Sequence, residues 1–243
     1  MLKINKKLLK IIYKNKILLG HNTSERNYNI TKYILFKKNN IDIINPIKYI
    51  NLQNNAEKIL QKCAYIGGKI LFLGTKKQIS YLIKKYAKIV NMPYINNKWP
   101  AGLLSNIKIT KFSINKKKNI KTKKNTIYNY LSKKEKLLLN RKYKKINKKF
   151  GSIINLNKLP LFIIIVDIKK EFIALKEAIK SYIYIIGIID TNCSTNNIDY
   201  PIIANDDSYK SVKFILKRLT LSIIKGFKKR EKKLLKYNEY KKN

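Results

Sequence analysis

Two aspartates stand directly after the two most apolar runs of the chain. Asp167 follows residues 161–166, and Asp190 follows residues 184–189. Parallel α/β folds place active sites at such strand ends, so two carboxylates there could act on a phosphorylated substrate. The alternative is that each carboxylate caps the turn or helix that follows, and the sequence favours this alternative because possible catalytic partners are few.

Few other side chains could complete a catalytic site. His21 is the only histidine, so a Ser-His-Asp triad or a histidine–metal site has almost nothing to draw on. Cys63 and Cys193 are the only cysteines, and Cys193 as a nucleophile would lack a second histidine to activate it. We interpret His21 as a packing or hydrogen-bonding residue, with RNA contact as its alternative. We interpret Cys193 as a small buried apolar residue, and we expect no metal site and no disulfide.

Lys76 and Lys77 follow the apolar run 69–74 and open a predicted helix. The N-terminus of a helix, together with nearby amides, can hold a phosphate. Neither the Gly-x-x-x-x-Gly-Lys-Ser/Thr motif nor the Gly-x-Gly-x-x-Gly fingerprint is present, so we expect no nucleotide cofactor and no small-molecule substrate. An RNA phosphate contact and a solvated helix start both stay open for these two lysines.

The charge of the chain indicates a polyanionic partner. Fifty-five Lys and Arg residues stand against 13 Asp and Glu residues, which gives a net charge of +42. Abundant Lys, Asn, Ile and Tyr are typical of an extremely AT-rich genome, but such a bias does not remove Asp and Glu so completely. We therefore predict that nucleic acid is the main partner. The apolar runs are too short to span a bilayer, so we expect no membrane partner.

Three segments hold most of this charge. Residues 1–20 carry +6, residues 105–150 carry +16, and Lys225–Asn243 carry +7, so a polyanion should meet these segments first. The candidate RNA-binding residues are Lys76, Lys77, Lys98, Lys108, Lys111, Lys116, Lys117, Lys118, Arg141 and Lys145.

The apolar runs and their spacing predict the elements that position these residues. Continuous apolar runs at 69–74, 161–166 and 184–189 are typical of strands covered on both faces. Helices with one apolar face lie between them, and this rhythm predicts a parallel sheet. Residues 41–44 read as a further strand before the helix that Asn45 and Pro46 open and that Gly67 ends, while residues 22–40 are expected to be loop with a short strand near 33–36.

These elements divide the chain into four parts. The α/β domain comprises residues 21–104 and 151–225, preceded by a basic extension at 1–20. Residues 105–150 form a basic insertion of two antiparallel helices that turn within 115–132. Residues 226–243 form a basic tail, mobile or ordered only on a partner. Trp99, at the start of the insertion, either stacks on a base or fixes the junction between the sheet and the hairpin.

Several motifs resemble the bacterial-type small-subunit ribosomal protein S2 family. Residues 67–78, GGKILFLGTKKQ, are similar to the family's GGKILFVGTKKQ. Residues 92–96 (MPYIN) and 99–106 (WPAGLLSN) are similar to its MPYVN and WLGGMLTN. Further matches follow in family order over roughly residues 17–227, at 20–21, 131–135, 159–160, 166–167, 190–193, 199–202 and 204–208.

The resemblance implies a Rossmann-like (flavodoxin-like) three-layer α/β domain with a parallel sheet and an inserted antiparallel helical hairpin. It implies a structural, non-enzymatic role at the head–body junction of the small ribosomal subunit. The implied partners are small-subunit rRNA and neighbouring small-subunit ribosomal proteins. Residues 204–226 look most like plastid members, which together with the AT-rich composition predicts translation in a reduced, apicoplast-like plastid rather than a mitochondrion.

The chain departs from the family at three places. Arg26-Asn27-Tyr28 replaces a Trp-Asn-Pro, and Pro100-Ala101-Gly102 replaces a paired Gly-Gly. The hairpin is far more basic than the family's mixed-charge version, and we hypothesise that it has gained direct contacts to rRNA phosphates.

Two other function classes stay open beside the ribosomal one. A small Rossmann-like enzyme acting on a phosphorylated substrate would use Asp167 and Asp190, and it would bind nucleotide alone in a ligand-sized cleft. A free RNA-binding regulator would leave ribosomal particles at modest salt, whereas a structural subunit would sediment with them.

Overall fold

The computed structural model describes residues 6–106, 130–150, 152–153 and 158–240, and the isolated positions 112, 115, 119, 120, 122 and 126. The helices are α1 (Lys6–Lys14), α2 (Pro46–Ile66), α3 (Lys77–Ile89), α5 (Lys133–Phe150), α6 (Phe172–Lys180) and α7 (Tyr209–Tyr240), with 3-10 turns η1 (Thr23–Glu25) and η2 (Tyr28–Tyr33). The strands are β1 (Leu19–Asn22), β2 (Ile34–Lys38), β3 (Ile41–Ile44), β4 (Ile70–Leu73), β5 (Tyr94–Ile95), β6 (Phe162–Val166), β7 (Tyr184–Ile189) and β8 (Tyr200–Ile203).

The centre of the molecule is a five-stranded parallel sheet with the order β5-β4-β6-β7-β8. Counted along the chain within this sheet, the order is 2-1-3-4-5, which is the flavodoxin-like order. The predicted Rossmann-like parallel fold is therefore confirmed. The three apolar runs form β4, β6 and β7, as expected.

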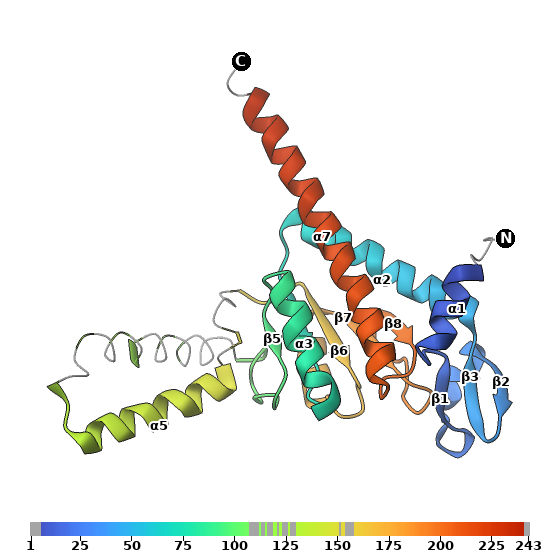
Figure 1. The fold of residues 1–243 in the computed structure, drawn as a ribbon, viewed down its shortest axis with the longest axis horizontal. Helices are drawn as coiled ribbons and strands as arrows, with labels where there is room; N and C mark the ends of the chain where they lie inside the picture. Colours follow the sequence, from blue (N-terminus) through green and yellow to red (C-terminus); the bar gives the residue numbers. More distant parts are fainter. Residues whose placement is uncertain are drawn as a thin grey trace.

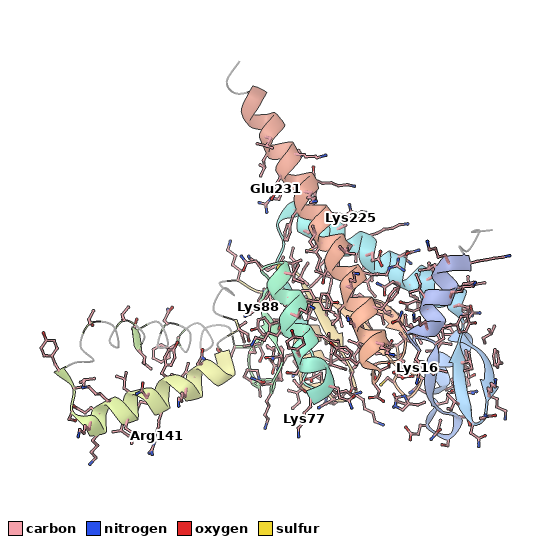
Figure 2. All side chains as sticks on the ribbon, viewed as in Figure 1. Lys16, Lys77, Lys88, Arg141, Lys225 and Glu231 are labelled. Atoms are coloured by element: carbon pink, nitrogen blue, oxygen red, sulfur yellow. The ribbon has the colours of Figure 1, made fainter. Side chains whose placement is uncertain are left out.

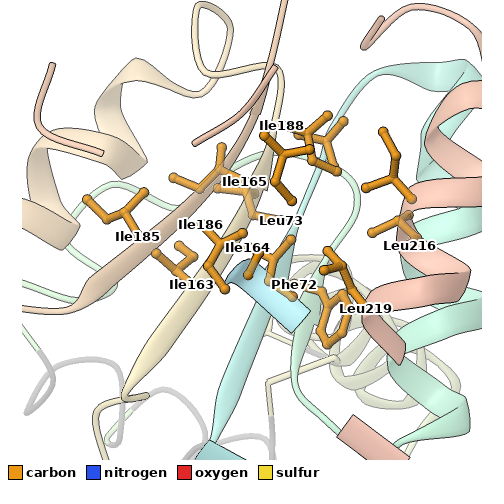
Figure 3. Close-up of a cluster of buried hydrophobic side chains, with 14 of the residues drawn as sticks. Phe72, Leu73, Ile163, Ile164, Ile165, Ile185, Ile186, Ile188, Leu216 and Leu219 are labelled. Carbon is orange, nitrogen blue, oxygen red and sulfur yellow. The ribbon is translucent and has the colours of Figure 1, made fainter. Parts of the chain in front are cut away.

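The pairing register places the side chains of the core. Phe72, Ile164 and Ile186 are register partners on adjacent strands, so they share one face of the sheet. Figure 3 shows them between the sheet and Leu216 and Leu219 of α7. Their neighbours along the strands, among them Ile163 and Ile185, point to the other face, and α6 packs against β7. Both faces are covered, which explains why these strands are apolar throughout.

Local signals set both ends of α2. The Asn45 side chain accepts hydrogen bonds from the N–H groups of Ile47 (2.9 Å) and Lys48 (3.3 Å), and Pro46 occupies the first helical turn. Gly67 ends the helix in the left-handed conformation with φ of 81°. The predicted boundaries of this helix are confirmed.

Helix α7 packs along α2 and continues beyond the body of the domain (Figure 1). Gly226 permits this close approach, because a Cβ there would lie 2.5 Å from the carbonyl oxygen of Gln61. The sequence analysis placed a separate tail at 226–243, but the helix runs without interruption to Tyr240. A basic segment of strong helix formers simply extends a helix that is already nucleated by its packed first half.

A second, antiparallel sheet was not predicted. Its order is β1-β3-β2, with β2 and β3 joined by Asn39 and Asn40, both at positive φ as two-residue hairpins require. The short strand expected near residues 33–36 is confirmed as β2, and residues 41–44 form the expected strand as β3. Strand β1 and the pairing of these three strands in a separate sheet were not predicted. Short strands with exposed faces lack the apolar run that revealed the central strands.

Helix α5 belongs to the predicted hairpin and extends away from the α/β domain (Figure 1). The first helix of the hairpin and its turn lie largely outside the described residues. Within the described part of the chain, none of the helices combines the length and apolar content that a membrane crossing requires.

Candidate nucleic-acid interface

Charged side chains from five segments meet at the carboxyl end of the parallel sheet. The Nζ atom of Lys76 lies 2.8 Å from Asp167 Oδ2, 3.1 Å from Asp206 Oδ1 and 2.7 Å from Asp207 Oδ1. The strands are parallel, so the residues that follow them are brought to one edge. We call the following residues the edge cluster: His21, Lys76, Asp167, Asp190, Asp206 and Asp207.

His21 contributes the second cation of the edge cluster. Its Nδ1 lies 3.0 Å from Asp190 Oδ2, and its Nε2 lies 3.3 Å from Asp207 Oδ2. A doubly protonated imidazole suits this position, because each ring nitrogen faces a carboxylate oxygen. Contact with Asp190 raises the pKa of His21 to about 9, against burial, which lowers it. His21 is therefore an imidazolium at neutral pH and ties β1 to the edge of the large sheet.

The edge cluster sets two cations against four carboxyl groups, and burial changes how far some of these groups ionise. Burial lowers the pKa of Lys76, but its bonds to Asp167 and Asp207 outweigh burial and raise that pKa above its usual value. Burial raises the pKa of Asp206 to about 7, although Lys76 opposes this. At neutral pH, His21 and Lys76 are therefore protonated, while the carboxyl group of Asp206 is only partly ionised.

The two lysines predicted at this helix start have different environments. Lys76 is engaged with three carboxylates and only 23% of its side chain is exposed. Lys77 is the first residue of α3 and is exposed, as Figure 2 shows at the end of that helix. Of the pair, only Lys77 presents an uncommitted side chain to an external phosphate.

The loop after β4 lies at the switch point between β4 and β6, where doubly wound folds bind phosphorylated ligands. In this chain, the Glu171 carboxylate accepts the hydrogen bonds that Thr75 of this loop donates. Its Oε1 accepts the Thr75 N–H at 3.1 Å and also the Thr75 hydroxyl. Burial raises the pKa of Glu171 despite these bonds. A buried carboxyl group at this position competes with a substrate phosphate for the same amide.

The aspartates predicted after the strands act mainly within the chain. Asp167 Oδ1 accepts from Lys170 N–H at 3.2 Å, and Asp190 Oδ1 accepts from Thr191 N–H at 2.6 Å. The capping interpretation is therefore confirmed, and the ion pairs with Lys76 and His21 were missed. Burial raises the pKa of Cys193 to about 11, so its thiol stays protonated. Among the described residues, no His, Cys, Asp or Glu side chains are grouped as a metal site requires.

Helix α5 presents the opposite electrostatic situation. Its single acid, Glu135, forms a capping box, since Glu135 Oε2 accepts from Ser132 N–H (2.9 Å) and from the Ser132 hydroxyl (2.8 Å). These bonds lower the pKa of Glu135. Arg141 points to solvent (Figure 2). The exposed basic side chains of α5 are Lys133, Lys134, Arg141, Lys142 and Lys144.

Several predicted contact residues lie outside this description. Lys108, Lys111 and the run 116–118 fall outside the described residues, and so does the side chain of Lys145. Lys98 is exposed and lines a cavity of about 340 Å³ together with Lys170 and Trp99. Lys98 and Lys77 thus lie on the α/β domain, separate from Arg141 on the hairpin.

A buried carboxylate anchors the start of the insertion. Glu177 of α6 accepts from Trp99 Nε1 at 3.1 Å, from Gly102 N–H at 2.7 Å and from Leu104 N–H at 3.0 Å. Trp99 is only 8% exposed, so it fixes the junction and does not offer its ring to a base. Sequence reasoning missed this role of Glu177. The sequence did contain one indication of this role, because Glu177 lies on the apolar face of α6, and a buried carboxylate there requires hydrogen-bond donors from the rest of the chain.

Comparison with family models agrees with this architecture. Residues 12–226 match the model for Ribosomal protein S2. The chain belongs to the ribosomal protein S2 family. The family resemblance in the sequence motifs is thereby confirmed across the α/β domain and the insertion.

Individual members of the S2 family match most of the chain. Small ribosomal subunit protein uS2 of Karelsulcia muelleri (strain GWSS) is 50% identical over 206 residues, covering 84% of this chain and 93% of the relative. The protein of the same name from Flavobacterium johnsoniae is 40% identical, covering 93% and 89%. That from Christiangramia forsetii is 38% identical, covering 87% and 71%.

Proposed function

We propose that this chain is a structural constituent of the small ribosomal subunit, binding rRNA and neighbouring small-subunit proteins without catalytic turnover. The observation that carries the proposal is the match to S2 family members, each named a small ribosomal subunit protein, over 93%, 89% and 71% of the length of the three relatives above. The engagement of Thr75 by Glu171 and the protonated Cys193 thiol give the enzyme alternative no support.

The distribution of charge supports rRNA as the main partner. Six of the acidic side chains in the α/β domain are buried, and they bond to groups of the chain itself: Asp42, Asp167, Glu171, Glu177, Asp190 and Asp206. They therefore contribute little repulsion against a polyanion outside. The exposed surface keeps its lysines, and counterion release from phosphates then stabilises the complex.

We propose specific residues for the rRNA contacts. Lys77, Lys98 and Arg141 qualify because their side chains are exposed. The high positive charge of the insertion is the only basis for the remaining candidates, which are Lys108, Lys111, Lys116, Lys117, Lys118 and Lys145. Lys76 is left out because three carboxylates bind its ammonium group. In this proposal the insertion 105–150 and the basic ends of the chain are the parts that reach RNA.

Sedimentation of a cell lysate through sucrose at low and high salt tests the proposal. A structural subunit migrates with the small subunit at both salt concentrations. Presence at the top of the gradient at both concentrations would contradict it. Migration with particles only at low salt would instead identify a free RNA-binding regulator.

A finer proposal concerns the compartment in which this ribosome works, either a reduced plastid or a bacterial endosymbiont. The AT-rich composition and the segment 204–226 support translation in a reduced plastid. The same composition arises in reduced bacterial genomes, and 50% identity to the protein of an endosymbiont favours that second setting. Mass spectrometry of ribosomes from purified plastids and from purified endosymbiont cells separates the two, since the protein should appear in only one fraction.

A further inference from the structure

Tyr182, between α6 and β7, has an unfavourable position for its residue type. Its φ of 52° lies in the left-handed region, which glycine adopts freely and tyrosine does not. Its side chain is 95% exposed, so no burial offsets the strain. This conformation closes the C-terminus of α6, because the Tyr182 N–H bonds to the Ile179 carbonyl at 3.1 Å and the Ile183 N–H bonds to the Ala178 carbonyl at 3.0 Å. It leaves the large ring in solvent, where a partner outside the chain can reach it.

Two adjoining cavities lie beside this residue. The first, of about 440 Å³, is lined by Tyr182, Tyr184 and Asn197 among others. The second, of about 340 Å³, is lined by Tyr200 and by Lys58 and Lys62 of α2. Asp199 lines both, so the two cavities adjoin at this residue. We call them together the tyrosine trough.

The aromatic wall of the tyrosine trough is held by the core. The Tyr184 ring stacks on Phe162 with a centroid distance of 5.1 Å and an interplanar angle of 25°. Phe162, which is 6% exposed, also meets the Tyr200 ring at 6.1 Å. The wall is therefore preorganised, and a ligand that stacks on it need not order it.

The charges around the tyrosine trough favour a ligand with phosphates. Lys58 and Lys62 line the second cavity and are exposed, and the exposed Lys180 stands two residues before Tyr182 in the chain. The carboxylate of Asp199 accepts the Ile185 N–H at 2.7 Å, so it serves the backbone of β7. Exposed aromatic faces with amides and lysines nearby are the groups that bind unpaired RNA bases and their backbone.

We propose that the tyrosine trough binds unpaired bases of rRNA, with Tyr182 stacking on a base and Lys58 and Lys62 contacting flanking phosphates. This rests on the proposed function and names the form of RNA that the site takes. A second copy of the chain is a poor occupant, because each copy carries a net charge of +42. An acidic protein segment is the competing occupant that the experiment must separate.

Two substitutions of one residue separate stacking from folding. Tyr182→Gly removes the ring and relieves the strained φ, so its thermal midpoint should equal or exceed that of the parent chain. Tyr182→Phe keeps the ring and serves as the matched control. Full-length chains are titrated onto small-subunit particles that lack this protein. We expect Tyr182→Gly to bind on the order of tenfold more weakly, and Tyr182→Phe to bind like the parent.

Ultraviolet cross-linking of the reconstituted particles, read by mass spectrometry, identifies the occupant. A nucleotide attached to the peptide that contains Tyr182 and Tyr184 is the expected result. Parent chain that enters particles with an affinity unaffected by Tyr182→Gly would overturn this inference alone. A protein cross-linked at these tyrosines would overturn it in favour of the acidic segment. Failure of the parent chain to enter particles would overturn the proposed function itself.

Discussion

The edge cluster and helix α5 use charge in opposite ways. At the edge of the sheet, Lys76 and His21 lie among four aspartates and are largely withdrawn from solvent. On α5, the single acid Glu135 is engaged in the helix cap, and within the described part of the chain no ion pair joins the exposed basic side chains of this helix to a carboxylate.

The difference shows that net charge by itself does not locate a binding surface. A lysine enclosed by carboxylates stabilises the fold and is a weak ligand for phosphate, because the phosphate would have to displace those carboxylates. A lysine on an exposed helix loses only counterions when it binds RNA. The location of the acidic residues therefore decides which lysines are available.

Lys76→Met should have the largest effect, because it removes a cation of the edge cluster. The substitution leaves Asp167 and Asp206 buried without their cation, and we expect the free energy of unfolding to fall by about 3 kcal/mol. The matched control is Lys77→Met, one residue along and exposed, which should change stability by less than about 0.5 kcal/mol. Urea denaturation of both variants measures this, and equal stabilities would contradict the assigned role of Lys76.

Glu177→Gln tests the anchor between the two regions. The amide replaces one acceptor with a donor that faces backbone N–H groups, so at least one buried donor loses its partner. We expect a loss of about 2 kcal/mol in unfolding free energy. Glu25→Gln, at an exposed acid, is the control. Faster hydrogen exchange at Gly102 and Leu104 in the Glu177 variant alone would show that the start of the insertion has loosened.

The pH dependence of stability reports on His21. Its pKa is raised from 6.5 to about 9, so its contribution is complete below pH 6.5 and is lost as the pH rises through 9. The raised pKa of Asp206 acts in the same direction, but its effect ends near pH 7. Between pH 7 and 9 we expect a loss of about 1.5 kcal/mol, allowing for partial solvent exposure. A His21→Asn chain should show a flat profile across this window.

The salt dependence of RNA binding sharpens the comparison at the hairpin. Replacing Lys116, Lys117 and Lys118 with Gln should reduce the slope of log affinity against log salt by about one per lost phosphate contact. With three contacts, the parent chain should then lose about eightfold more affinity than the variant when the salt concentration is doubled. The control replaces Lys84, Lys85 and Lys88, which are exposed on α3. Equal slopes for parent and hairpin variant would contradict the hypothesis of direct phosphate contacts.

Much of the fold follows from local features of the sequence. The run 161–166 is apolar at every position because β6 is covered on both faces, and Asn45, Pro46 and Gly67 act on their own helix ends. The face of α7 that carries Ile215 and Leu219 follows from helical periodicity alone. Such signals act within a few residues, so the sequence displays them directly. The ordered set of S2 motifs also needed no structure.

Other features depended on contacts between distant segments. Lys76 pairs with Asp206 and Asp207, 130 and 131 residues away, and nothing near Lys76 in the sequence distinguishes it from Lys77. Strand β3 belongs to an antiparallel sheet because its backbone pairs with β1 on one side and β2 on the other. Its own residues do not indicate these partners. The sequence by itself determined the central strands β4, β6 and β7, both ends of α2, and the family. The tertiary structure alone decided which charges are neutralised within the chain, since that depends on which strand ends the sheet brings together.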